Sequence, residues 1–402
     1  MSLRHRRDGS DVRLNGFTNP RVTSLPPPRG DDILLRRRIS VLLVRGGGGG
    51  DGTRGNDKLS LSSSPLLNGQ RISSFTTSDA GNNSNNINNK NQSDNQNDDE
   101  SDEGDELPRV LQRYPVTGCA AIGWRPYMED EALIQSDMVG VFDGHGGASV
   151  SRYVRQNLYG HIQTILPRVV EERRLEGEST GSTGDDTCGD GVVGVDSPRA
   201  TVQDYESTLR RALEKINGDV LRIVHWSYQG STAVVCWLHE GLDGEGDRIR
   251  TLVAANIGDS RLVLSRDGEA VALSRDHKPD DPIEMDYIRS QGGKVTYPSG
   301  VPRVNGVMAL SRAIGDRSET PSIRAEPDLI RQVLSREDDF YVLATDGLWD
   351  VMTNQEVVTF LRDCYETDLS DDSRQELTKN LVLEALSRGA EDNITVLVVW
   401  LR

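Results

Sequence analysis

The chain has 402 residues, and its 46 basic against 63 acidic side chains give a formal net charge of −17. An acidic chain without a dominant basic patch is a poor candidate for nucleic-acid binding, because such binding relies on Lys and Arg contacts to phosphates. Hydrophobic residues make up 35% of the chain and aromatic residues 5%. This is too little for a compact globule throughout, so part of the chain is predicted not to fold.

The cysteines are far apart in sequence and form no CxxC pair; they are Cys119, Cys188, Cys236 and Cys364. This spacing argues against a disulfide framework and favours a reducing compartment. No apolar run approaches the ~18 residues of a membrane-spanning helix, and the N-terminus lacks a signal-peptide core. We therefore expect an intracellular soluble protein, cytoplasmic or nuclear, with no integral membrane segment. A basic N-terminus leaves organelle targeting open, although Asp8 and Asp11 count against it.

Residues 1–113 are predicted to form a disordered, low-complexity tail. Proline, glycine and asparagine tracts lie here, followed by the acid-rich stretch Asp94–Glu106, and such segments bury too little apolar surface to offset chain entropy. The apolar segment Ile33–Val44 surrounds three arginines. It is interpreted as a docking peptide, a phosphorylation site at Ser40, or a chance cluster, and the last is favoured.

Residues 114–402 are predicted to form one globular domain. Short apolar runs typical of strands recur there: Ala132–Ile134, Val139–Phe142, Ser231–Leu238, Ile249–Asn256, Leu262–Ser265, Phe340–Thr345 and Ile394–Leu401. Hairpin turns are expected at Gly258–Asp259 and Asp267–Gly268. Helical spacing predicts helices over Ala148–Val169, Val202–Val224, Asp281–Gln291, Asn354–Cys364 and Ser373–Arg388. Between the first two helices, 171–199 lacks an apolar period and is predicted to be a surface insertion. Paired strands and paired helices favour layered sheets covered by helices.

Acidic residues follow several of these buried runs directly. Asp143 directly follows Val139–Phe142, and Asp346 directly follows Phe340–Thr345. Asp392 shortly precedes the final strand. Each acid taken alone is more simply an exposed turn residue. Together they would repel one another unless cations hold them. Oxygen ligands without nearby cysteine favour Mg²⁺ or Mn²⁺ over zinc, so we predict a polynuclear metal site.

A series of motifs then carries a resemblance to a known family. In chain order they are RPYMED, VFDGHGG, GSTAVV, ANIGDSR, DHKP, VMALSRAIGD, ATDGLWDVM and EDNITVLVV. Their order and spacing resemble the metal-dependent serine/threonine protein phosphatases of type 2C, the PPM family, over about 114–402. The resemblance implies an α+β fold: a four-layer αββα sandwich in which two antiparallel β-sheets are flanked by helices on both sides.

The resemblance also implies roles for individual residues. Asp143 would bridge two metal ions, and the carbonyl of Gly144 would bind one of them. The remaining ligands would be Glu129, Asp346 and Asp392, with Asp259, Asp346 and Asp350 at a weaker third site. Asp130 would orient metal-bound water, Arg125 would hold the substrate phosphate, and His145 would be the general acid. The segment 280–306 would be the flap that shapes substrate access.

The residue types suit these roles. Arginine offers a rigid two-pronged donor for phosphoryl oxygens; a surface pair with Glu129 or Glu131 is the alternative for Arg125. A serine or threonine alkoxide is a poor leaving group, so a histidine near the site suits a general acid. His277 is interpreted as a loop packing residue. The hydroxyl of Thr232 is expected to satisfy backbone groups. Ser311, Arg312 and Asp316 could be catalytic in principle, but a hydrogen-bonded turn beneath the site is the favoured interpretation.

The resulting hypothesis is a monomeric enzyme acting on phosphoprotein substrates. It would hydrolyse phosphoserine and phosphothreonine with water activated by two Mg²⁺ or Mn²⁺ ions, without a phosphoenzyme intermediate. The alternative is a catalytically inactive pseudophosphatase that serves as an adaptor, which would require damaged ligands. The sequence shows no such substitution.

Overall fold

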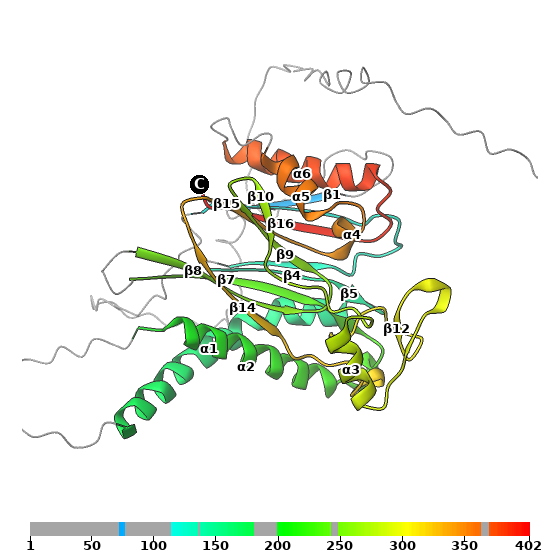
Figure 1. Ribbon diagram of the computed structural model, residues 1–402, viewed down its shortest axis with the longest axis horizontal. Coiled ribbons are helices and arrows are strands. Elements are labelled where there is room, and N and C mark those ends of the chain that lie inside the picture. Colours follow the sequence, from blue (N-terminus) through cyan, green and yellow to red (C-terminus); the bar gives the residue numbers. More distant parts are fainter. Residues whose placement is uncertain (1–71, 77–113, 136, 181–198, 243–247, 363–369) are drawn as a thin grey trace, which may run out of the picture. The chain divides into compact units, whose positions relative to one another are not determined.

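The computed structural model describes residues 72–76, 114–135, 137–180, 199–242, 248–362 and 370–402. Within them, two antiparallel sheets lie face to face, with helices on both outer faces (Figure 1). The predicted α+β sandwich is therefore confirmed. The predictions for Ile33–Val44, Cys188 and Cys364 lie outside the described residues.

The first sheet has six strands in the order β1-β2-β16-β15-β9-β10. Their bounds are β1 Ile72–Thr76, β2 Val116–Ala121, β9 Arg261–Arg266, β10 Glu269–Ala272, β15 Asp338–Ala344 and β16 Ile394–Trp400. All seven residues of β16 are buried. Val396 and Val398 pack toward the outer helices, whereas Leu397 and Val399 pack toward the second sheet. Burial on both faces explains why this strand is a continuous apolar run rather than an alternating one.

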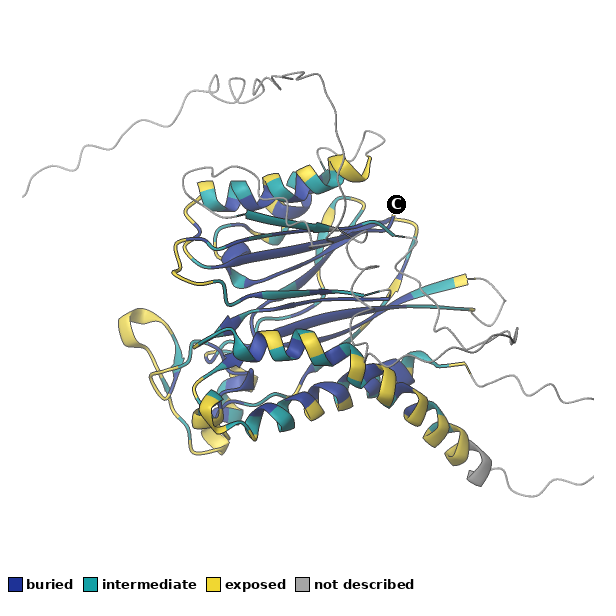
Figure 2. Ribbon diagram, turned by 180° about the vertical axis from the view of Figure 1, so that it is seen from behind, coloured by how far each residue is buried: buried dark blue, intermediate teal, exposed yellow. Residues whose placement is uncertain are grey.

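The second sheet has five strands in the order β14-β8-β7-β4-β3. Their bounds are β3 Glu131–Ile134, β4 Met138–Phe142, β7 Ala233–Leu242, β8 Arg248–Ile257 and β14 Asp328–Leu334. The strand β4 also contributes to two layers, with Phe142 facing the helices and Val141 facing the first sheet. Figure 2 shows both sheets as the buried centre of the domain.

The outer layers consist of helices with one apolar side. The helices α1 Ser149–Thr180 and α2 Val202–Leu221 cover the second sheet, and α5 Asn354–Arg362 and α6 Asp371–Ser387 cover the first. A single turn, α4 Asp346–Trp349, follows β15 directly. The predicted helices are all present. The sequence gave no separate signal for α4, because one turn is too short to show a helical period.

Shorter elements lie at one end of the sandwich. The helix α3 Pro282–Ser290 begins as predicted: Asp281 Oδ1 accepts the backbone N–H of Ile283 at 2.9 Å, with proline in the first turn. A hairpin follows, β11 Val295–Thr296 and β12 Arg303–Val304. A separate three-stranded ladder has the order β13-β6-β5, with bounds β5 Gly144–His145, β6 Gly230–Ser231 and β13 Ile314–Gly315. Single 3₁₀ turns span Val224–Trp226, Pro298–Gly300 and Arg317–Glu319. No described helix has the length and apolar character needed to cross a bilayer.

The strand β1 corrects the prediction that all of 1–113 is unstructured. Ile72–Thr76 pairs antiparallel with β2 and forms the edge of the first sheet. Phe75 packs into the core between the sheets, and a Cβ on Gly118 would lie 2.1 Å from its ring. An apolar anchor and five pairing positions thus hold this short segment, although its neighbours in sequence are polar.

The end of one helix and the type of one turn also differ from the sequence predictions. The helix α1 runs to Thr180, so the first part of the predicted insertion 171–199 is helical. Ion pairs support this polar end, among them Arg173 with Asp204 and Arg211 with Glu172. The turn at Gly258 is not a hairpin either, because β8 and β9 belong to different sheets. The Asp267–Gly268 turn does join a hairpin, β9 to β10.

Candidate metal centre

Three carboxylates meet where strands of both sheets end. Carboxylate oxygens of Asp143, Asp259 and Asp346 all lie within 4.8 Å of one another. Asp143 follows β4, Asp259 lies in the crossing from β8 to β9, and Asp346 opens α4 after β15. The chain must turn at each of these points, so an acid directly after a buried strand emerges at the same end of the sandwich. The structure therefore joins two of the predicted ligands of the main site with one predicted for the third site.

The ionised forms of Asp143 and Asp346 are disfavoured. Removal from water raises the pKa of Asp143 well above its usual range, and the charges of Asp130 and Asp346 raise it further. Removal from water, followed by the charges of Asp259 and Asp350, raises the pKa of Asp346 to about 8. The buried Asp346 Oδ1 has no hydrogen-bond partner among the described residues. Crowded carboxylates with an unpartnered oxygen fit a divalent cation, which takes oxygen ligands and stabilises their charged form.

Asp130 lies beneath this cluster in a fixed orientation. Its Oδ2 accepts hydrogen bonds from the hydroxyls of Thr345 at 2.9 Å and Thr395 at 2.8 Å. Burial raises the pKa of Asp130 to about 7, although the two threonine hydroxyls oppose this shift. Its second oxygen is buried without a partner among the described residues. Among the described residues, this oxygen of Asp130 is therefore left available to a group bound at the cluster.

The other predicted ligands surround the cluster without belonging to the three-carboxylate group. Asp392 is half-buried and contacts Arg125. Asp350 is exposed, one turn after Asp346, and its charge contributes to the raised pKa of Asp346. Glu129 is half-buried, and its backbone N–H donates to Asn393 Oδ1 at 2.7 Å.

Gly144 lies where no side chain would fit. An added Cβ would be 2.4 Å from the carbonyl oxygen of Glu129 and 2.6 Å from Ser151 Oγ. Ser151 itself donates to the Glu129 carbonyl. The start of α1 thus holds the loop that carries Glu129 and Asp130 against β5.

The guanidinium of Arg125 pairs with Asp392, at 2.5 Å from Nη2 to Oδ2. Among the ion pairs of the described residues, none joins Arg125 to Glu129 or Glu131, and Glu131 contacts Arg152 and Arg155 of α1 instead. The side chain of Arg125 is 54% exposed, so a ligand can reach it from solvent.

His145 is held by Asp316, which the sequence analysis interpreted as part of a turn beneath the site. Its Nε2 lies 2.7 Å from Oδ2 of Asp316, whose side chain is only 3% exposed. Burial alone would lower the pKa of His145, but the hydrogen bond and charge of Asp316 raise it above its usual value. The contact with Asp316 therefore favours the protonated ring, which is the form that a general acid requires.

Lys278 is a second residue that the sequence analysis did not place in the site. Its Nζ lies 2.5 Å from Asp259 Oδ2. Burial would lower the pKa of Lys278, yet Asp259 and the neighbouring carboxylates raise it to about 12. A lysine two residues after an acid gives no signal by itself. Only the packing of its loop against the β8–β9 crossing brings it here.

Residues beneath the site confirm their predicted structural roles. Thr232 Oγ1 accepts the backbone N–H of Asp143 at 3.1 Å, which fixes the start of the turn. His277 is fully buried; its Nδ1 accepts the backbone N–H of Gly258 at 3.0 Å and its Nε2 lies 3.1 Å from Asp328. Arg312 is buried against Glu284 of α3.

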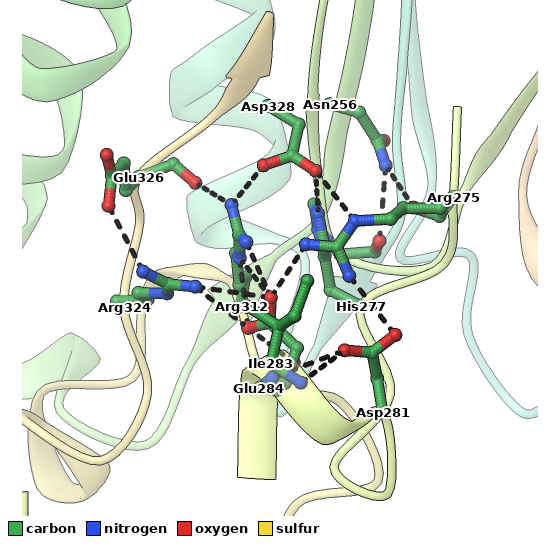
Figure 3. A network of polar contacts seen from close by, with 12 residues as sticks. Asn256, Arg275, His277, Asp281, Ile283, Glu284, Arg312, Arg324, Glu326 and Asp328 are labelled. Atoms are coloured by element: carbon green, nitrogen blue, oxygen red, sulfur yellow. Dashed lines mark hydrogen bonds and ion pairs between the residues drawn. The ribbon is translucent and has the colours of Figure 1, made fainter. Parts of the chain in front are cut away.

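Figure 3 shows this last contact as part of a network that fastens α3 to the sandwich. The Glu284 side chain is fully buried and contacts three guanidinium groups, those of Arg275, Arg312 and Arg324. Burial alone would raise the pKa of Glu284, but Arg312 and then Arg324 hold it at about 2. The expected flap 280–306 is therefore anchored at its first helix by a buried ionic network.

Comparisons with known proteins give a consistent result. A family model described as "Protein phosphatase 2C" matches residues 117–394. "Probable protein phosphatase 2C 45" of Oryza sativa subsp. japonica is 35% identical over 285 residues, covering 69% of this chain and 84% of that protein. "Protein phosphatase 2C 50" of the same species is 34% identical over 303 residues, covering 68% and 71%. A crystal structure titled as a phosphatase from a pathogenic strain of Toxoplasma gondii is similar in fold, with a TM-score of 0.54 and 22% identity over 71% of this chain and 92% of that one.

Proposed function

This chain belongs to the protein phosphatase 2C family, and we propose that it hydrolyses phosphoserine and phosphothreonine in proteins by direct attack of water. The observation that carries the proposal is the meeting of Asp143, Asp259 and Asp346 within 4.8 Å. Membership of the family supports protein phosphatase activity. Beyond this activity, we propose the specificity for serine and threonine, the direct mechanism and a monomeric state.

We assign two Mg²⁺ or Mn²⁺ ions to this centre, held by Asp143, the Gly144 carbonyl, Glu129, Asp346 and Asp392. A weaker third ion would use Asp259 and Asp350 together with Asp346. When bound, such ions lower the pKa of a coordinated water and offset the negative charge of the phosphate. The raised pKa values of Asp143 and Asp346 support the assignment, because a cation is what keeps such buried acids ionised.

The side chains around the centre have distinct tasks. Arg125 binds two phosphoryl oxygens and orients the phosphate, for which it must exchange its contact with Asp392 for the substrate. Asp130, fixed by two threonine hydroxyls, accepts a hydrogen bond from the attacking water and orients it. His145 donates a proton to the leaving serine or threonine oxygen as the phosphorus–oxygen bond breaks.

The decisive experiment is phosphate release from phosphoserine and phosphothreonine peptides by the full chain, with Mn²⁺, with Mg²⁺ and with excess chelator. We expect release with either metal and none with chelator. An inactive adaptor would release no phosphate under any of these conditions. Phosphate that stays attached to the protein in acid-quenched samples would contradict the direct mechanism.

A further inference from the structure

A short ladder brings His145 and Asp316 together from distant parts of the chain. In the sheet β13-β6-β5, His145 is paired with Gly230, and Gly230 is paired on its other side with Gly315. Asp316 follows Gly315 directly and extends its carboxylate over the middle strand. The result is the 2.7 Å contact between His145 Nε2 and Asp316 Oδ2.

The middle strand leaves room for this contact. A Cβ on Gly230 would lie 2.2 Å from Asp316 Oδ2 and 2.5 Å from His145 Nε2. Any other residue at position 230 would therefore occupy the space in which the carboxylate meets the ring.

The backbone of Asp316 is strained, and its surroundings hold it in place. Its φ of 44° and ψ of 47° are left-handed, which is uncommon for a residue other than glycine. The backbone N–H of Asp316 donates to the Gln229 carbonyl at 2.9 Å, and that of Gly315 donates to Asn217 Oδ1 at 3.0 Å. These bonds fix the direction in which the carboxylate leaves the chain.

We propose that Asp316 is a positioning residue for His145. Its carboxylate accepts the Nε2 hydrogen, which sets the orientation of the ring and leaves Nδ1 as the nitrogen that serves the leaving group. The Nδ1 proton passes to the serine or threonine oxygen while the phosphorus–oxygen bond breaks. Loss of this proton leaves a neutral ring whose Nε2–H is still bonded to Asp316. Nδ1 then regains a proton from solvent. The role of Asp316 in the reaction rests on the proposed function. The position of the hydrogen on Nε2 of the neutral ring does not, because it follows from the contact with Asp316.

The first test is the Asp316→Asn variant of the full chain, compared with wild type in Mn²⁺. Asparagine keeps the size of the side chain and tolerates left-handed backbone, but it removes the charge that fixes the ring. We expect kcat on a phosphoserine peptide to fall by about 10- to 100-fold, as for other residues that orient a catalytic group, with KM nearly unchanged. On an aryl phosphate, whose leaving group needs no proton, the loss should stay below about threefold.

Two comparisons separate positioning from a general structural effect. Asp219→Asn removes an acid from another histidine pair, the contact of His161 on α1 with Asp219 on α2 at 3.7 Å, and should leave both substrates unaffected. Adding Asp316→Asn to His145→Ala should slow the peptide reaction no further than His145→Ala alone. The proposal would be overturned if the losses of the two single variants multiplied in the double variant. It would also be overturned if Asp316→Asn slowed the peptide and the aryl phosphate equally.

The second test needs no substrate, and its result is read in the wild-type protein. In ¹⁵N-labelled wild-type protein, the neutral ring of His145 should carry its hydrogen on Nε2, identified by the signals that disappear in His145→Ala. A neutral ring with its hydrogen on Nδ1 would refute the proposal even where Asp316→Asn does not fold. Should wild type release no phosphate from either substrate, the proposed function fails while the tautomer result still decides the geometry.

Discussion

Arg125 and Asp392 form an ion pair, with 2.5 Å between Nη2 and Oδ2, although one is the proposed phosphate ligand and the other a proposed metal ligand. Arg125 lies in the first of the sequence motifs and Asp392 in the last. They meet because β16 begins beside the loop that precedes β3. On the proposed assignment, phosphate and metal would each compete for one member of this pair, so their binding would be coupled through one contact.

Asp346→Ala should abolish metal binding and activity together. The variant removes one of three carboxylates that meet within 4.8 Å, and in chelator it should be at least as stable as wild type because it also removes a buried, repelled charge. Isothermal titration with Mn²⁺ and peptide dephosphorylation check both effects. Asp219→Ala, on α2, is the matched control and should bind metal normally. Wild-type metal affinity in Asp346→Ala would exclude this residue as a ligand.

The stability of the chelated protein should fall as the pH rises. The pKa of Asp346 is raised from 3.8 to about 8 and that of Asp130 to about 7, so between about pH 4 and 8 the folded state binds more protons than the unfolded state. The free energy of unfolding then decreases with pH over this window. Urea denaturation from pH 5 to 8 measures the slope, and added Mn²⁺ should reduce it. A stability that rises with pH in chelator would contradict the assignment of these shifts.

His145→Ala should affect substrates according to their leaving groups. Removing a general acid costs about 10²- to 10⁴-fold when the leaving group is a serine alkoxide, but little when it is an aryl oxide. Initial rates on a phosphoserine peptide and on an aryl phosphate give the comparison. His161→Ala, on α1, serves as the control. Equal losses on both substrates would indicate a structural role for His145 instead.

Glu284→Gln should destabilise the domain by about 3 kcal/mol, because it leaves the buried guanidinium of Arg312 and its two partly exposed neighbours without their shared counter-charge. Glu284 is fully buried between Arg275, Arg312 and Arg324. Glu326→Gln removes an exposed partner of Arg324 and should change the free energy of unfolding by less than about 1 kcal/mol. Urea denaturation distinguishes the two variants. Equal effects would mean that the network does not anchor α3.

Phe75→Ala should destabilise the full chain by about 1 to 3 kcal/mol, less than the full cost of a completely buried phenylalanine. The ring packs between the sheets over Gly118. A chain that begins at Tyr114 lacks β1 altogether and should be less stable still. Ser73→Ala, in the same strand, is the control. If the chain from Tyr114 were as stable as the full chain, β1 would contribute nothing to the domain.

Several features of the site could be predicted because they depend on local sequence. Val139–Phe142 indicated a buried strand, and the acid that follows it had to emerge at the strand end. His277 and Thr232 were likewise assigned structural roles that the contacts confirm. The contact of Asp316 with His145 could not be predicted, because it depends on two strand pairings across Gly230.

The sequence by itself determined the family, the types of most elements and the residues that end them. These features follow from apolar periodicity and turn chemistry within a few residues. Only the tertiary structure decided which side chains meet: Asp259 reaches Asp143 because the chain crosses between sheets at Gly258, where a hairpin was expected. It also decided that Ile72–Thr76 joins the first sheet. The order of strands is set by burial of the whole core, and that order is not contained in any single stretch of the chain.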